Sequence, residues 1–147
     1  MNLLIKKNED MRKYIFFILV VLSSLNIFSN DVTNQPFYNT SPKDGLWEAM
    51  DYYGIHHQDI VYAQAYVETG NFTSIGCKNK NNLFGLMQGK KLRRFNHWSE
   101  SVKFYKEKIQ SKYKGGDYYS FLKRIKYATS PTYNQALKKV VKKIKRK

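Results

Sequence analysis

The segment 63–89, AQAYVETGNFTSIGCKNKNNLFGLMQG, is the part of the chain on which the interpretation of the sequence depends. It contains one acidic side chain, Glu68, among apolar, small and amide residues. The apolar residues around it predict a helix from about His57 to Thr69 that ends at Gly70, because glycine commonly follows the last turn of a helix. We therefore expect the rest of the chain either to fix this carboxyl group in place or to bring it to its target.

Glu68 is expected on the apolar face of that helix. At about 100° per residue, its side chain shares a face with Val61, Gln64 and Ala65. Burial without a neighbouring cation favours the neutral form of a carboxyl group, which a general acid needs near neutral pH. The alternative is a glutamate that ends a helix and points to water, although the helix dipole disfavours a negative charge there.

Composition limits the class of protein. The chain has 147 residues, enough for one domain once a targeting segment is set aside. Lys and Arg number 26 against 11 Asp and Glu, a net charge of +15, which favours an anionic partner such as nucleic acid, a membrane surface or an acidic envelope polymer. The single cysteine, Cys77, excludes an internal disulfide and a cysteine-rich zinc site. We expect no metal and no cofactor.

The N-terminal residues predict the compartment. Basic residues precede an apolar run over 14–28, and this pattern is typical of a signal peptide, expected over residues 1–29. The alternative is an uncleaved anchor, although the run contains Ser and Asn where a membrane span needs about 20 apolar residues. We expect an exported protein of the periplasm or cell envelope, or a secreted one. Residues 30–40 are polar and interrupted by Pro36, which predicts a linker.

The first helix of the domain is expected to begin at Ser41, where Ser-Pro-Lys-Asp combines a cap, a proline in the first turn and an acid three residues after the cap. Apolar residues follow at helical spacing: Leu46, Trp47, Met50 and Tyr53. We expect Trp47 in the core rather than as a platform for a sugar ring. Gly54 is expected to end this helix.

Three more helices are expected after segment 63–89. Ser99 and Asp117 should cap two of them, and Ser130-Pro131 should begin the third. Their apolar stripes are Val102, Tyr105, Ile109 and Tyr113; Tyr118, Phe121, Leu122 and Ile125; and Tyr133, Leu137, Val140, Val141 and Ile144. The sequence thus predicts a mainly α domain of five helices, with at most a minimal β-ribbon between Leu83 and Phe95.

The order of the motif residues resembles the signature of a known family, the bacterial glucosaminidases, which are peptidoglycan hydrolases of flagellar-rod and autolysin type. The matching residues are Ala63-Gln64-Ala65, Glu68-Thr69-Gly70, Phe72, Ser74 and Asn81-Asn82-Leu83-Phe84-Gly85. Later residues are similar to a region of the family rich in aromatic residues and serine: Phe95, Trp98, Ser99, Ser101, Val102 and Tyr105. Tyr127-Ala128-Thr129, Tyr133 and Leu137 are similar to its Y-A-T-x-x-x-Y-x-x-x-L pattern. The likeness implies a catalytic domain over residues 41–137.

The resemblance implies a lysozyme-like helical fold and an endo-β-N-acetylglucosaminidase activity on peptidoglycan. It implies that Glu68 is the general acid that protonates the glycosidic oxygen and that Tyr127 belongs to the active site. The residues expected to bind substrate are Gln64, Ser74, Asn82, Phe84 and Gly85. The run 84–88 is also similar to the G-L-M-Q of goose-type lysozymes and lytic transglycosylases, so a transglycosylase or muramidase remains an alternative. We expect a monomer.

One departure concerns the second carboxylate that most glycosidases use. Residues 69–99 contain no Asp or Glu. Glu100 is expected to interact with a helix dipole and Asp117 to cap a helix, whereas Asp59 lies more than two turns before Glu68. We therefore hypothesise a single-acid mechanism, with either a water held by amides and Tyr127 or the substrate's own acetamido group in place of the second carboxylate.

The last ten residues, 138–147, contain seven Lys or Arg. They predict either a solvated helix face or electrostatic adhesion to anionic envelope polymers or a membrane surface.

The sequence favours a glycosidase over four other functions. Export disfavours nucleic-acid binding. A cysteine peptidase would need a histidine beside Cys77, and nothing in the sequence positions His56, His57 or His97 there. A zinc amidase would need a dedicated ligand set. A non-catalytic wall-binding module stays open because the second carboxylate is missing.

Overall fold

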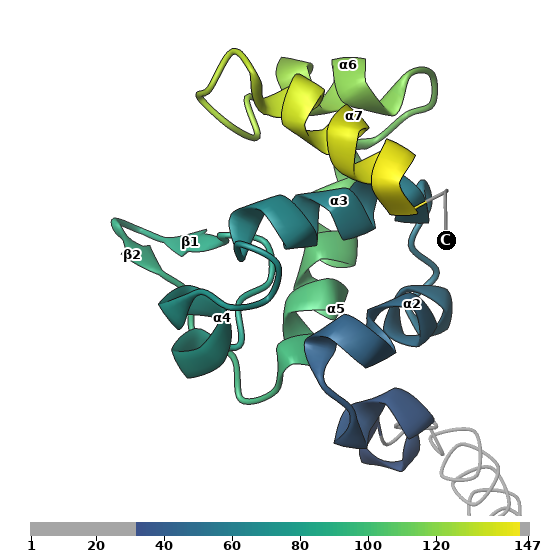
Figure 1. Ribbon diagram of the computed structural model, residues 1–147, viewed down its shortest axis with the longest axis vertical. Helices are drawn as coiled ribbons and strands as arrows, with labels where there is room; N and C mark the ends of the chain where they lie inside the picture. The colour runs from purple at the N-terminus through teal and green to yellow at the C-terminus, as the bar shows by residue number, and fades with distance from the viewer. Residues whose placement is uncertain (1–31, 145–147) are drawn as a thin grey trace, which may run out of the picture. The chain divides into compact units, whose positions relative to one another are not determined.

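The computed structural model describes residues 32–144 (Figure 1). They fall into two units that divide after Asn34. The described part of the first unit is a 3₁₀ helix, η1 (Val32–Asn34). The predicted signal peptide, residues 1–29, lies outside the described residues.

The second unit is mainly α-helical, as the sequence predicts. Its described residues form six α-helices, two 3₁₀ helices and one two-stranded sheet. The elements in chain order are η2 (Pro36–Asn39), α2 (Pro42–Tyr52), α3 (Gln58–Glu68), α4 (Ile75–Lys80), β1 (Met87–Gln88), β2 (Lys91–Leu92), α5 (Trp98–Lys108), η3 (Gln110–Lys112), α6 (Tyr118–Arg124) and α7 (Tyr133–Ile144). The strands pair antiparallel, with Met87 opposite Leu92 and Gln88 opposite Lys91, which is the ribbon expected between Leu83 and Phe95.

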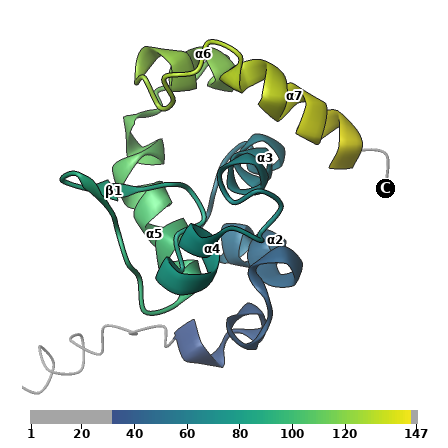
Figure 2. The same cartoon turned by 60° about the vertical axis from the view of Figure 1, so that its left-hand side comes forward.

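Helix α3 lies at the centre of the unit, with α7 along one side and α2 on another (Figures 1 and 2). Six consecutive residues of α3, 60–65, are buried, which is the pattern of a helix enclosed on all sides. Large buried side chains come from every layer around it: Leu46, Met50, Val102, Tyr105, Phe121, Leu122 and Leu137. The packing of the core around α3 therefore fixes the position of its last residue, Glu68.

Several helix ends follow the predicted signals. Gly54 and Gly70 adopt positive φ after α2 and α3, and the Asp117 carboxylate accepts the Ser120 backbone N–H at 2.8 Å to cap α6. Two starts differ from the prediction. The His97 side chain, rather than Ser99, caps α5, and α7 begins at Tyr133, two residues after Pro131. Helix α4 was not expected, because Asn79 within it and Ser74 and Asn81 at its two ends are residues typical of a loop.

The segment expected to be a linker is partly folded. Phe37 is 1% exposed, and its ring packs edge-on against Trp98 with centroids 6.0 Å apart. The Trp98 indole N–H donates to the Thr40 carbonyl at 3.1 Å. The compact unit therefore begins at Gln35, because one buried aromatic ring anchors an otherwise polar stretch.

Trp47 is not a core residue. Its side chain is 39% exposed and stacks on the buried ring of Tyr62. The prediction of a core position was wrong, since helical spacing identifies the face of α2 but not the edge of that face.

No helix within residues 32–144 is both long enough and apolar enough to cross a membrane.

We predict that Gly45→Ala destabilises the protein. A Cβ at this position would lie 2.1 Å from Thr40 Oγ1 and 3.1 Å from Phe37 Cβ, so η2 would have to move. Overpacking of this kind costs about 1 to 3 kcal/mol in free energy of unfolding, measurable by urea denaturation.

Gly76→Ala is the matched control for Gly45→Ala. Its Cβ would lie 3.5 Å from Leu92 Cδ1, an ordinary van der Waals contact. It should leave stability unchanged or raise it by up to about 1 kcal/mol. Equal effects of the two substitutions would contradict the packing of η2 on α2.

Candidate functional site

Glu68 is the last residue of α3, and its carboxyl group is partly buried. The Tyr133 hydroxyl, at the start of α7, donates a hydrogen bond to Glu68 Oε1 at 2.8 Å. Burial raises the pKa of Glu68 above its usual range, and the Tyr133 hydrogen bond opposes part of that rise. The carboxyl group is thus biased toward its neutral form by desolvation, as the sequence predicts.

The acidic residues considered as a second carboxylate have structural roles. Glu100 Oε2 accepts the Asn96 backbone N–H at 3.1 Å in front of α5, and Asp117 caps α6. The cap at Asp117 confirms its prediction, and Glu100 lies in the first turn of α5, where it is expected. Among the described residues, neither these two carboxylates nor any other contributes to the pKa of Glu68.

Gly85 lies against the second oxygen of Glu68. A Cβ on Gly85 would be 2.8 Å from Glu68 Oε2, closer than side-chain carbons approach such an atom. Gly85 also has a φ of +62°, in the region that L side chains rarely adopt. Both the backbone conformation and the nearby carboxyl group therefore require glycine here.

Asn82 and Phe84 shape the loop that brings Gly85 to this place. The Asn82 amide nitrogen donates to the carbonyls of Leu86 and Arg93, and its oxygen accepts the backbone N–H of Leu86 at 2.9 Å. Phe84 is 2% exposed, and its ring packs against Tyr105 with centroids 4.6 Å apart. Both residues, predicted to bind substrate, are buried and hold the backbone of the loop that carries Gly85.

Tyr127 supports the same loop from the other side. Its hydroxyl donates to the Phe84 carbonyl at 2.8 Å, and its ring lies 5.9 Å from that of Tyr133. Burial raises the pKa of Tyr127 well above its usual value, so it stays protonated. Its direct partner is the loop backbone, one residue before Gly85.

Tyr133 is a site residue that the sequence interpretation missed. It was assigned to the apolar stripe of the last helix and to the final tyrosine of the Y-A-T-x-x-x-Y pattern. Burial and the neighbouring Glu68 carboxylate raise its pKa far above the usual range, which makes it a donor at any working pH. One feature of the sequence could have identified Tyr133: its polar hydroxyl lies in a helical stripe that is otherwise apolar and faces the core.

Gln64, predicted to bind substrate, lies inside the protein one turn before Glu68 on α3. It is completely buried, and its oxygen accepts the Tyr105 hydroxyl at 2.6 Å. The chain of hydrogen bonds continues from Tyr105 to Tyr118 at 2.9 Å and from Tyr118 to Gln110 at 3.1 Å. The Gln64 amide is near enough to Tyr133 to lower its pKa, but Nε2 makes no hydrogen bond of standard geometry within the described residues.

Ser74, also predicted to bind substrate, caps α4. Its hydroxyl accepts the Cys77 backbone N–H at 3.2 Å.

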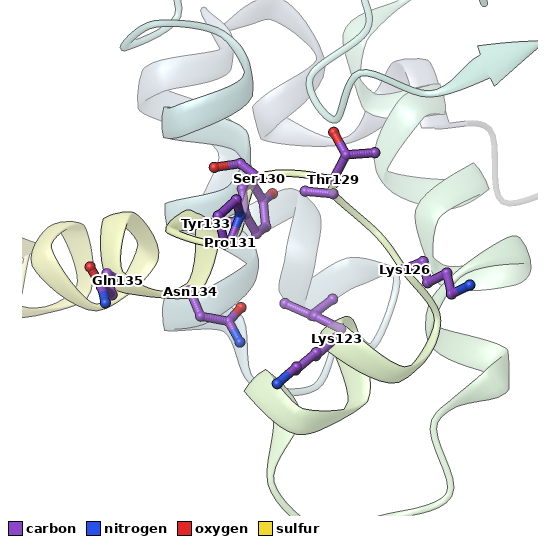
Figure 3. A pocket seen from close by; sticks show the side chains of 10 residues that line it. Lys123, Lys126, Thr129, Ser130, Pro131, Tyr133, Asn134 and Gln135 are labelled. Atoms are coloured by element: carbon purple, nitrogen blue, oxygen red, sulfur yellow. The ribbon is translucent and has the colours of Figure 1, made fainter.

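Tyr133 borders a cavity of about 380 Å³ between α6, the loop that follows it and the start of α7 (Figure 3). The polar residues around this cavity include Lys123, Lys126, Ser130 and Asn134.

Cys77 is poorly suited to act as a nucleophile. Cys77 is buried, and burial raises its pKa, whereas a nucleophilic cysteine needs a lowered pKa. No group of three His, Cys, Asp or Glu side chains within residues 32–144 is placed to hold a metal ion.

A family model described as mannosyl-glycoprotein endo-beta-N-acetylglucosaminidase matches residues 43–146. The chain belongs to this glucosaminidase family, which suggests a glycosidase that acts on peptidoglycan. Neither the curated proteins nor the solved structures include a significant match to the chain.

We predict that Tyr133→Phe raises the pKa of Glu68 further. The substitution removes the hydrogen bond that favours the ionised carboxylate, while burial continues to favour the neutral form. A ¹³C NMR titration of the Glu68 carboxyl carbon measures the shift. Tyr66→Phe is the control. Tyr66 lies on α3, the helix of Glu68, but its hydroxyl is bonded to Lys143 instead of Glu68. A lower pKa in Tyr133→Phe, or equal shifts in both variants, would contradict this geometry.

We predict that Gly85→Ala impairs hydrolysis of peptidoglycan much more than Gly89→Ala. The two glycines have similar positive φ, +62° and +60°, so the backbone strain is matched. A Cβ at Gly89 meets nothing within 4 Å, whereas a Cβ at Gly85 meets Glu68. Displacement of a catalytic group by about 1 Å can cost roughly 100-fold in rate. Comparable turnover by the two variants would place the reaction elsewhere.

Proposed function

We propose that the protein is a peptidoglycan hydrolase that cleaves the glycan strand at N-acetylglucosamine, with Glu68 as its general acid. The observation that carries the proposal is the environment of Glu68. Its pKa is raised by burial, one of its oxygens accepts the Tyr133 hydroxyl, and the other faces Gly85. Family membership supports the glycosidase class.

In this mechanism, protonated Glu68 gives its proton to the glycosidic oxygen as that oxygen separates from the anomeric carbon of N-acetylglucosamine. The Glu68 carboxylate that remains accepts the Tyr133 hydroxyl, which stabilises the charge left by the departing proton. Water then adds to the sugar and returns a proton to Glu68. One carboxyl group therefore serves as acid and afterwards as base.

The positive charge on the sugar needs a partner in place of a second carboxylate. The Asn82 amide and the Tyr127 hydroxyl are already bonded to the loop backbone, so neither is well placed to hold an attacking water. We therefore favour assistance by the substrate's acetamido oxygen, which bonds to the anomeric carbon and is later displaced by water. This favours a substrate that carries a 2-acetamido group on the sugar to be cleaved.

A lytic transglycosylase or a muramidase is the second candidate, because the single carboxyl group suits those reactions too. The products separate the three: a glucosaminidase leaves reducing N-acetylglucosamine ends, a muramidase leaves reducing N-acetylmuramic acid ends, and a transglycosylase leaves anhydro ends. A non-catalytic wall-binding module would leave the polymer intact.

We predict that Glu68→Gln lowers the turnover of purified peptidoglycan by about 100-fold to 10,000-fold. Glu100→Gln and Asp117→Asn should keep most of the activity, because these side chains cap helices. Since the protonated form of Glu68 is the active one, activity should fall as pH rises through its raised pKa. Mass spectrometry of the digest measures turnover and end type together. Equal losses in Glu100→Gln would refute the single-acid mechanism.

The proposal also assigns a compartment and partners. Its substrate lies in the cell envelope, and the apolar N-terminal sequence supports export. Exposed lysines on α7 support adhesion to anionic envelope polymers or a membrane surface: Lys138, Lys139, Lys142 and Lys143.

A further inference from the structure

A second pocket lies away from Glu68, between α2, α3 and the end of α7. Its volume is about 390 Å³, within the range of pockets that bind small ligands. Tyr133 contacts Glu68 at the start of α7, whereas Lys143, ten residues later, lines this pocket. At 1.5 Å per residue, the two positions are about 15 Å apart along the helix axis. Tyr66 also lines the pocket, and at about 100° per residue its side chain lies on the opposite face of α3 from Glu68. None of the described residues lines both this pocket and the cavity beside Tyr133. The pocket is therefore on a different side of α3 from Glu68.

One wall of the pocket is aromatic, and other rings pack against it inside the protein. Trp47 stacks on Tyr62 with centroids 4.9 Å apart and an angle of 12° between the ring planes. Tyr62 is 9% exposed and Trp47 is 39% exposed, so the indole covers the tyrosine and remains open to solvent itself. Phe72 packs edge-on against Tyr62 at 5.7 Å. A flat apolar surface held in this way suits the face of a sugar ring, because little side-chain freedom is lost on binding.

The rest of the lining is cationic and amidic. Lys43 and Lys143 belong to it, together with Asn71, and none of the described residues that line the pocket is acidic. The Lys143 ammonium donates to the Tyr66 hydroxyl at 3.2 Å and lies 5.4 Å from the centre of that ring. Asp44, which lies near Tyr62, accepts the Ser41 hydroxyl. The two ammonium groups therefore have no carboxylate partner in the lining.

We propose that this pocket is an accessory site for the muramyl peptide of peptidoglycan, an amino sugar whose attached peptide bears a free carboxylate. The pyranose ring lies on Trp47 and the acetamido group meets Asn71. The carboxylate of the peptide lies between Lys43 and Lys143. The identity of the polymer rests on the proposed function. The site would hold a glycan strand at a distance from Glu68 and so favour long, peptide-bearing strands over short neutral ones.

The test is a titration of the full chain carrying Glu68→Gln with N-acetylmuramyl-L-alanyl-D-isoglutamine, followed by NMR of the two tryptophan indole N–H groups. Trp47 should shift to saturation. Trp98 is the internal control and should stay fixed, because it is buried and its N–H is bonded to Thr40. Lys143→Gln should weaken binding about twofold to fivefold, the range of a surface ion pair, and the difference should shrink in high salt.

Lys139→Gln is the matched control, since Lys139 is exposed on the same helix and does not line the pocket. Equal weakening by Lys139→Gln would mean general charge attraction, and equally tight binding of the neutral sugar tri-N-acetylchitotriose would overturn the carboxylate preference. A Trp47 signal that does not saturate would overturn the site itself. The assay needs no turnover, so a protein that binds the muramyl peptide but never digests peptidoglycan would refute only the proposed function.

Discussion

The hydrogen bond from Tyr133 to Glu68 joins residues 65 positions apart and links the start of α7 to the end of α3. It fixes one oxygen of the carboxyl group, and the backbone of Gly85 lies against the other. The two constraints act on different oxygens and come from different parts of the chain. Between them, they leave Glu68 little rotational freedom, so the position of its proton is set by the fold rather than by a flexible side chain.

A buried polar chain lies behind this contact. Gln64, Tyr105, Tyr118 and Gln110 are linked by hydrogen bonds that cross from α3 through α5 to α6 and η3. Buried polar groups are costly unless they are paired, and networks of them favour one arrangement of the core over others. The arrangement of the buried residues next to the site is therefore fixed by hydrogen bonds in addition to apolar packing. This explains why Gln64, beside Glu68 on the helix face, serves the site without meeting solvent.

Local patterns in the sequence were enough to predict the end of α3, the cap at Asp117 and the raised pKa of Glu68, because these depend on neighbours in the chain or on one helix face. Contacts between distant residues were not predictable in the same way. Phe37 packs against Trp98, and Tyr133 reaches Glu68, only once the helices are assembled. The predicted substrate residues Gln64, Asn82 and Phe84 are buried, since a motif records which residues a site needs but not which of them face outward.

The cause of the raised pKa of Glu68 separates two properties of the protein. Desolvation, and not a neighbouring charge, is the largest influence on this carboxyl group, and dissolved ions screen charges far more than they alter burial. The exposed lysines of α7 are in the opposite situation, since any attraction they exert passes through solvent. Proton transfer at Glu68 should thus respond to pH, whereas attachment through α7 should respond to ionic strength.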